Sequence, residues 1–126
     1  MQTYTYHLIH QTAVDLGSNG VVGGDYYFTY GNTLFMMLNT QDTNAAEHKQ
    51  FMEQAIAANP NCTWRVVTLH QDIYGSAEHS NEPEITNLRY TLVPYFEAND
   101  VDVVLTGHDH AYSRTHILEG GHKTVE

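Results

Sequence analysis

The sequence predicts an α/β fold, because two short strand-like runs are separated by a stretch with helical periodicity. The runs, Trp64–His70 and Val101–Leu105, are apolar and rich in β-branched residues, as strands buried on both faces of a sheet are. Residues 84–99, between them, carry apolar side chains at spacings of three and four. A strand–helix–strand order with a connection of this length favours a parallel pair, so the carboxyl ends of both strands should meet at one sheet edge.

Length and composition restrict the classes of function. The 126 residues allow at most one domain. A net charge of −10 argues against a surface for nucleic acid or anionic membranes, and no apolar stretch is long enough to span a membrane. The same charge suits a phosphate-binding site only if metal cations supply positive charge, and nine histidines against five Lys and Arg fit that reading.

The N-terminal part is predicted to contain an irregular arm followed by a hairpin. Residues 1–24 are polar and become glycine-rich toward their end, which indicates the arm. Two β-prone runs, Tyr26–Tyr30 and Thr33–Asn39, follow it and are joined by Gly31–Asn32. Glycine at the first central position of a two-residue connection is typical of a type II′ turn. The second strand is apolar almost throughout, so we expect it to be buried.

The first helix is predicted at Asn44–Ala58. Asn44, with Glu47 three residues later, forms a cap-and-carboxylate start, and Pro60 biases the preceding residue away from helical geometry. His48 is expected to be an ordinary surface or half-buried residue of this helix.

The second helix is predicted at about Glu84–Asn99, after a polar loop at Gln71–Pro83. Pro94 should kink or restart this helix, because proline removes an interior hydrogen-bond donor. The apolar stripe consists of Ile85, Leu88, Leu92, Tyr95 and Phe96.

Three histidines follow the two predicted parallel strands. His70 ends the first strand, while His108 and His110 come just after the second, where ligands bind in open α/β sheets. Neutral imidazole is the commonest metal ligand among side chains, and two imidazoles separated by one residue can serve neighbouring positions of a site. The alternative is a surface loop that happens to contain histidine. Two strands that both end in histidine favour a metal site.

The residues around these histidines resemble a known family. VTLH (Val67–His70) and GHDHAYSR (Gly107–Arg114) are similar to the last two signature blocks of the calcineurin-like metallophosphoesterases, VxxH and GHxH. The purple acid phosphatase branch is the closest match, since it usually has tyrosine and arginine where Tyr112 and Arg114 stand. The order of elements from Tyr26 onward also resembles that branch. The resemblance implies part of an α/β sandwich with mixed sheets flanked by helices.

The resemblance also implies a binuclear centre with two divalent or trivalent ions, such as Fe, Zn or Mn. His70 and His108 would bind one ion and His110 the other. Tyr112 and Arg114 would support the site, although Arg114 could instead form an ordinary salt bridge.

One further histidine is a candidate for the same site. In the purple acid phosphatase branch, a histidine at about this distance after VxxH contacts the phosphate from outside the metal shell, and His79 matches it by offset alone. The alternative for His79 is a solvated loop histidine.

The family's upstream blocks, GDxG, GDxxY and GNH[DE], are absent. The pairs at 24–25 and 31–32 imitate two of them, but Phe28 and Thr33 stand where tyrosine and histidine should be. Asp25 is therefore expected to be a loop or strand-edge residue. We interpret 1–126 as the C-terminal portion of a single metallophosphoesterase domain, truncated at both ends.

The leading hypothesis is a metal-dependent phosphoesterase acting on phosphomonoesters. The isolated chain should be inactive, because it lacks a bridging carboxylate, and Asp109 should face away from the histidines. The truncated chain is also expected to self-associate, and the resemblance suggests a secreted or cell-envelope location. The alternative is a non-catalytic binding module with at most one weak metal site. A purely structural histidine-rich domain would require two strand-end histidine motifs to coincide by chance.

Overall fold

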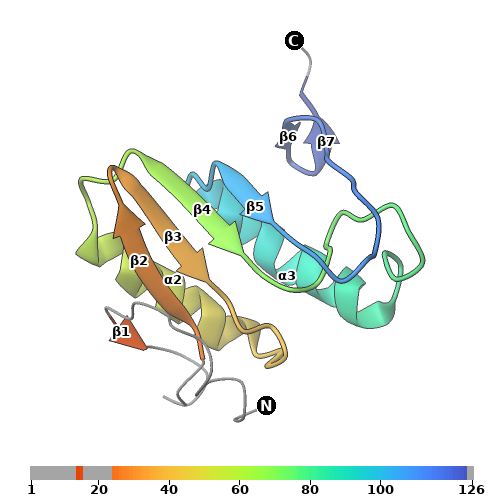
Figure 1. Cartoon of the computed structure of the whole chain (residues 1–126), viewed down its shortest axis with the longest axis horizontal. Coiled ribbons are helices and arrows are strands. Elements are labelled where there is room, and N and C mark those ends of the chain that lie inside the picture. The colour runs from red at the N-terminus through yellow and green to blue at the C-terminus, as the bar shows by residue number, and fades with distance from the viewer. Residues whose placement is uncertain (1–13, 16–23, 125–126) are drawn as a thin grey trace.

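The computed structural model describes residues 14–15 and 24–124, and its main feature is one mixed five-stranded sheet (Figure 1). Strand β2 is antiparallel to both of its neighbours, β1 and β3, whereas β3, β4 and β5 are parallel. The parallel pairing of β4 and β5 and the α/β class are as predicted. The strand order follows the chain: β1 (Val14–Asp15), β2 (Tyr26–Tyr30), β3 (Thr33–Met37), β4 (Trp64–Thr68) and β5 (Val103–Leu105).

The turn between β2 and β3 has the predicted geometry. Gly31 has a φ of +59°, and Asn32 is not among the residues with positive φ. A positive φ at the first central position alone is what a type II′ turn requires.

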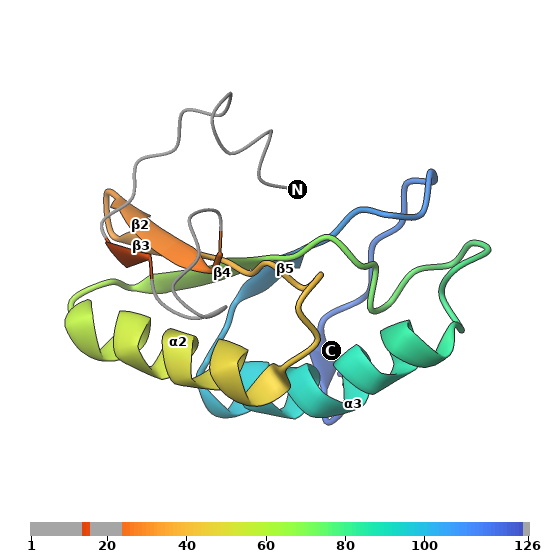
Figure 2. The ribbon, with the colours of Figure 1, turned by 90° about the horizontal axis from the view of Figure 1, so that it is seen from below.

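Helices α2 (Ala45–Ala58) and α3 (Pro83–Ala98) lie side by side on one face of the sheet (Figure 2). The Asn44 side chain caps α2 by accepting a hydrogen bond from the Glu47 N–H at 3.4 Å, as the sequence predicts. Pro83 occupies the first turn of α3, where its missing N–H costs nothing. Of the two effects predicted for Pro94, a restart does not occur, because α3 continues through it, and the kink stays a prediction.

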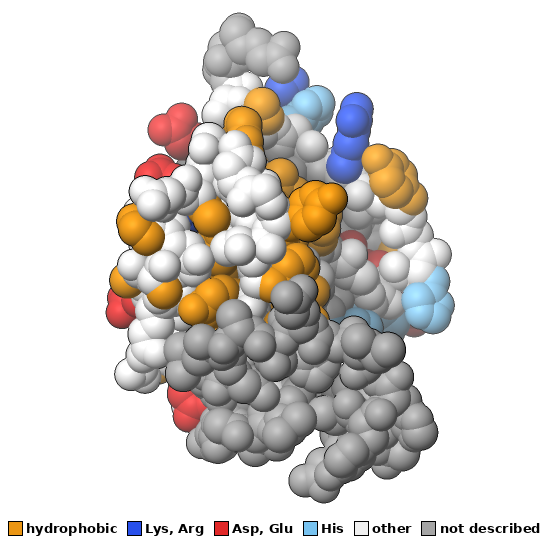
Figure 3. All heavy atoms as spheres, turned by 60° about the vertical axis from the view of Figure 1, so that its left-hand side comes forward, with side chains coloured by type: hydrophobic (Ala, Val, Ile, Leu, Met, Phe, Trp, Pro, Cys, Tyr) orange, Lys and Arg blue, Asp and Glu red, His pale blue; other side chains and the backbone are white. Residues whose placement is uncertain are grey.

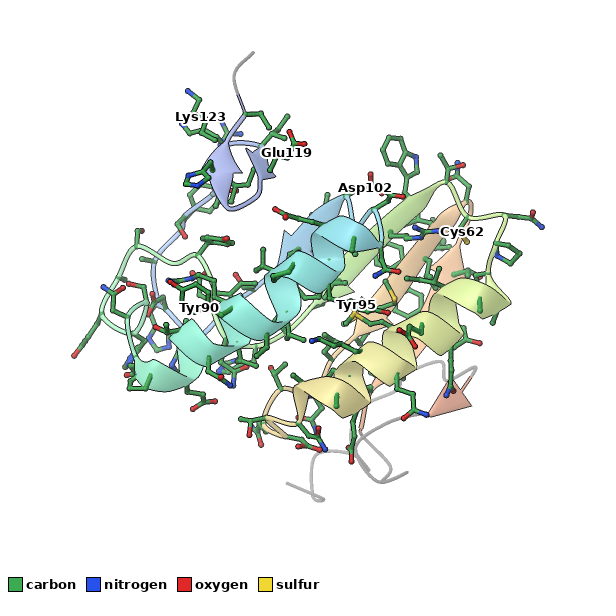
Figure 4. All side chains as sticks on the ribbon, turned by 180° about the vertical axis from the view of Figure 1, so that it is seen from behind. Cys62, Tyr90, Tyr95, Asp102, Glu119 and Lys123 are labelled. Atoms are coloured by element: carbon green, nitrogen blue, oxygen red, sulfur yellow. The ribbon has the colours of Figure 1, made fainter. Side chains whose placement is uncertain are left out.

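The hydrophobic core lies between these helices and the sheet. The predicted stripe of α3 faces it, and the Tyr95 hydroxyl donates to the Lys49 carbonyl of α2 at 3.2 Å (Figure 4). Burial, together with the charge of Glu53, raises the pKa of Tyr95 to about 12. The fully or almost fully buried members are Tyr27, Leu34, Met36, Leu38, Phe51, Met52, Ala55, Val67, Leu69, Ile73, Leu88, Leu92 and Phe96.

Among the described residues, both helices lie on one face of the sheet, and the exposure of side chains on the opposite face corrects two predictions of burial. In β3, Leu34 and Met36 are buried but Phe35 between them is only half-buried. In β5, Val103 and Leu105 are 46% and 50% exposed, although the sequence predicted a strand buried on both faces. Figure 3 shows hydrophobic side chains gathered on the molecular surface. The β-branched pattern predicted the strand correctly, but it could not reveal how far these side chains are exposed.

His48 also differs from expectation, because it is fully buried, as is Asp25, which lies in the loop directly before β2 as expected. The His48 Nδ1 lies 2.5 Å from Asp25 Oδ2, and His48 Nε2 lies 2.6 Å from the Asp42 carbonyl oxygen. Asp25 Oδ1 accepts the Asn39 N–H at 2.7 Å. The expectation of a surface or half-buried His48 is therefore wrong. The ring can be buried because each of its nitrogens has a hydrogen-bond partner inside the protein.

Two short strands lie near the ends of the described chain. Val14–Asp15 form β1 and pair with β2, so the expectation of an irregular arm over 1–24 is wrong for these two residues, while 1–13 and 16–23 lie outside the described residues. At the other end, β6 (Leu118–Glu119) and β7 (His122–Lys123) form a hairpin separate from the main sheet (Figures 1 and 4).

Neither of the helices in the described part of the chain is long and apolar enough to cross a membrane.

Candidate functional site

The carboxyl ends of β4 and β5 meet at one edge of the sheet. Their hydrogen-bond ladder continues past both strands, with the Leu69 N–H donating to Leu105 and the Gly107 N–H donating to His70, at 3.1 and 3.0 Å. This ladder places His70 beside the loop that begins at Gly107. The His70 Nε2 and His108 Nδ1 atoms are 3.2 Å apart. The predicted proximity of these two histidines is therefore observed.

The backbone at His108 is in an unusual conformation. Its φ is +71°, and the Asp109 N–H donates to the Gly107 carbonyl at 2.9 Å, closing a three-residue turn around it. A γ-turn with a positive φ at its centre is rare and strained, and non-glycine residues in such regions cluster at functional sites. The turn directs the His108 ring toward His70.

The polar loop after β4 brings a third histidine to the same place. The ring centroids of His79 and His108 are 4.5 Å apart. His79 Nδ1 lies 2.6 Å from Glu82 Oε1. The hydrogen bond to Glu82 raises the pKa of His79 above its ordinary value, with further contributions from the charges of Glu82, Glu78 and Asp109 that outweigh partial desolvation. This loop thus adds an imidazole and a carboxylate to the histidine pair.

The donor set fits a transition-metal ion. One ligand atom from each of His79, Glu82 and His108 can be chosen so that all lie within 4.8 Å of one another. Two nitrogens bound to one tetrahedral ion at about 2.0–2.1 Å lie about 3.3 Å apart, close to the 3.2 Å between His70 and His108. The same distance suits a hydrogen bond between the two rings, in which one nitrogen donates and the other is unprotonated. An unprotonated nitrogen is also what imidazole needs in order to bind a metal.

The structure does not bring three other predicted residues into this group. His110 is exposed and, within 24–124, makes no hydrogen bond or ring contact with the other histidines. The Tyr112 side chain is 89% exposed, and Arg114 is exposed without an ion pair in the same described range. The role of His110 as a ligand and the supporting roles of Tyr112 and Arg114 stay predictions. These roles rest on the resemblance to the family and not on contacts in the structure.

Glu82, three residues after His79, holds that histidine in the site. One residue of the site, Asp109, was missed by the sequence analysis as a participant. Asp109 is buried, and its carboxylate accepts the N–H groups of Ala77 and His79 at 3.3 and 3.1 Å. The segment that it contacts lies thirty residues away, and no sequence pattern indicated this contact.

Comparisons with known proteins indicate the family to which the chain belongs. The profile described as calcineurin-like phosphoesterase matches residues 4–112. An uncharacterized protein of Mycobacterium tuberculosis is 27% identical over 123 residues, which cover 84% of this chain and 23% of that protein.

Plant relatives match over shorter stretches. Purple acid phosphatase 19 of Arabidopsis thaliana is 38% identical over 68 residues, covering 52% of this chain and 17% of the relative. Purple acid phosphatase 5 of the same plant is 42% identical over 53 residues, which cover 41% of this chain and 13% of the relative.

The chain spans less than a quarter of the length of these relatives. No solved structure matches it. The family profile covers most of the chain and includes both histidine blocks that meet at the sheet edge, so the chain belongs to the calcineurin-like phosphoesterase family.

Proposed function

We propose that the protein is a metal-dependent phosphoesterase that hydrolyses phosphomonoesters at the edge of the sheet where β4 and β5 end. Family membership supports a phosphoesterase function, and the observation that carries the proposal is the approach of His70 and His108 from separate strand ends to 3.2 Å. Two imidazoles at this distance match the donor chemistry of Zn, Fe or Mn.

The chain would contribute part of a binuclear centre. His70 and His108 would hold one ion, and His110, whose side chain is exposed two residues later, would be available to the other. When bound, two such ions clamp the attacking and leaving oxygens of the phosphoryl group and lower the pKa of water. Further carboxylate ligands, a bridging one among them, would come from blocks that this sequence lacks.

His79 would orient the phosphate group. Its Nδ1 is held by Glu82, and the imidazolium that this contact favours carries a second N–H on Nε2, which can donate to a phosphate oxygen. Its ring lies against His108, so the donor would stand next to the metal-binding edge. Because the net charge of the chain is −10, a cationic donor beside the metal ions is well suited to binding the phosphate dianion.

A second candidate function is a binding module with one weak metal site. The observation that favours it is the engagement of Asp109, whose two carboxylate oxygens each accept a backbone N–H group, which makes it a poor candidate to bridge two ions. A single ion on His79, Glu82 and His108 would then be held without the second ion needed for the clamp.

Hydrolysis of an aryl phosphate by the full-length protein, with metal content measured on the same samples, tests the proposal. The wild type should turn over the substrate only when metal is present. His108→Ala should lower kcat/KM by more than about 100-fold, which is a larger loss than replacing a residue that only supports a metal ligand causes. The amount of metal bound per protein should fall as well. The matched control is His116→Ala, which replaces an exposed histidine outside the site and should leave both unchanged.

The 126-residue chain by itself should be inactive toward the same ester. A full-length protein that binds one ion and shows no turnover would exclude the phosphoesterase and favour the binding module. Vigorous hydrolysis by the short chain would show that one of its own carboxylates bridges the ions.

A further inference from the structure

Asp109 stands between two predicted metal ligands, yet its side chain turns inward. It is 8% exposed, and its Oδ1 accepts the His79 N–H at 3.1 Å while Oδ2 accepts the Ala77 N–H at 3.3 Å. A carboxylate that receives backbone N–H groups on both oxygens is well matched, because hydrogen bonds to an ionised acceptor are stronger than neutral ones. The loop with the histidines is thereby joined to the backbone of the loop that carries His79.

The loop from residue 71 to residue 82 is held differently on its other side. The Arg89 side chain, from α3, donates to the carbonyls of Ile73 and Ser80 at 2.5 and 2.9 Å. Arg89 therefore binds carbonyl groups of the loop, and Asp109 binds N–H groups. Both side chains thus provide hydrogen-bond partners for backbone groups that lie outside strands and helices. Buried backbone groups of folded proteins need such partners.

Gly75 allows Asp109 to approach this loop. A Cβ atom on Gly75 would lie 2.6 Å from Asp109 Oδ2 and 2.8 Å from Asp72 Oδ2, closer than real Cβ contacts. Asp72 is itself fixed, because its Oδ1 accepts the Thr106 hydroxyl at 3.0 Å. The absence of a side chain at position 75 is thus needed for space, so the loop sequence and the position of Asp109 are matched to each other.

We propose that Asp109 is a positioning residue that holds the His79 loop in place, so that the imidazole of His79 lies against His108. Asp109 touches neither substrate nor metal in this assignment, and it acts through the backbone of His79. The proposal rests on the proposed function for its effect on catalysis, but the contact between the two loops is independent of that function. A carboxylate that only filled space would have no specific link to His79.

A double-mutant cycle in the full-length protein tests the link. Asp109→Ala should lower kcat/KM for an aryl phosphate by about 10- to 100-fold, as losses of supporting residues do, with bound metal unchanged. In a His79→Ala background the same change should have almost no further effect, because the residue through which it acts is gone. Equal losses in both backgrounds would overturn the proposal. Asp102→Ala is the matched control, since the Asp102 carboxylate also accepts a backbone N–H, that of Arg65 at 2.8 Å, away from the site.

Amide hydrogen exchange gives a second readout that does not need enzymatic activity. In Asp109→Ala, the N–H groups of Ala77 and His79 should exchange at least about tenfold faster, while those of β4 stay protected. Gly75→Ala should produce the same local effect by displacing the carboxylate. Unchanged exchange in both variants would overturn the positioning role even if the protein proves to be a phosphatase. Faster exchange without any turnover in the wild type would support the loop contact and refute only the phosphatase proposal.

Discussion

His48 shows how a single residue acquires a role that its neighbours in sequence do not indicate. Both ring nitrogens face acceptors, the Asp25 carboxylate and the Asp42 carbonyl. An ionised carboxylate and a carbonyl can only accept hydrogen bonds, so both contacts are satisfied at once when the ring is protonated on both nitrogens. Burial alone lowers the pKa of His48, but the hydrogen bonds to Asp25 and Asp42 and their negative charges raise it above its ordinary value.

This pair predicts a pH-dependent stability. Because the folded pKa of His48 lies above the unfolded one, of about 6.5, its contribution should be fully present below pH 6.5 and be lost as pH rises through the folded pKa. Urea unfolding of the wild type and of His48→Gln between pH 5.5 and 9 measures the contribution as the difference between them. That difference should shrink with rising pH.

Asp25→Asn is the companion variant. Breaking a buried pair typically lowers the free energy of unfolding by about 3–5 kcal/mol, and the loss should be largest at the acidic end of the range. A difference between wild type and His48→Gln that stays constant with pH would refute the ion-pair assignment.

The start of helix α3 shows a conflict between an element and the candidate site. Glu82 occupies the N-cap position but makes no capping hydrogen bond, because its carboxylate contacts His79. Helix α2, by contrast, has a satisfied cap at Asn44. The N-terminal N–H groups of α3 therefore lack the side-chain acceptor that serine, threonine or asparagine would supply.

We predict that Glu82→Ser stabilises the protein while weakening the site. The serine hydroxyl can accept an N–H of the first turn, so the free energy of unfolding should rise by about 0.5–1 kcal/mol. His79 should become more mobile at the same time, as a stability–activity trade-off predicts. Asn44→Ser is the control, since it exchanges one good cap for another and should be nearly neutral. Equal stability changes in the two variants, measured by urea unfolding, would contradict the prediction.

At the scale of the whole molecule, both described helices, α2 and α3, pack on the same face of the sheet (Figure 2). Trp64, Val103 and Leu105, in β4 and β5, are each about half exposed. Strand β5 is also the last strand of the sheet, so its outer hydrogen-bonding edge has no neighbouring strand among the described residues. Exposed apolar side chains on an edge strand favour pairing with another chain.

Self-association of the 126-residue chain therefore stays a prediction with a defined test. Sedimentation should show a mass that increases with protein concentration, and Val103→Lys should shift it toward the monomer, because lysine on an edge strand opposes pairing. Tyr90→Lys, on an exposed position of α3, is the matched control and should leave the mass unchanged. A monomer at all concentrations, or the same shift in both variants, would contradict the prediction.

Sequence alone determined the features that depend on local periodicity and turn chemistry. The α/β class, both helices, the Gly31 turn and the parallel β4–β5 pair follow from spacings within a few residues. The proximity of His70 and His108 also follows, because parallel strands end at the same edge of a sheet. The two histidine blocks were enough to indicate the family.

Only the tertiary structure decided which polar residues are buried and what they contact. His48 reads as a surface residue of α2, yet it is buried against Asp25, which lies 23 residues earlier. Asp109 holds a loop 30 residues away through backbone N–H groups, which have no sequence signature. Burial of a charged group depends on a partner brought close by the fold, and the exposure of a strand's side chains depends on where the helices pack. Neither is encoded in the periodicity of a single segment, because both are properties of contacts between segments.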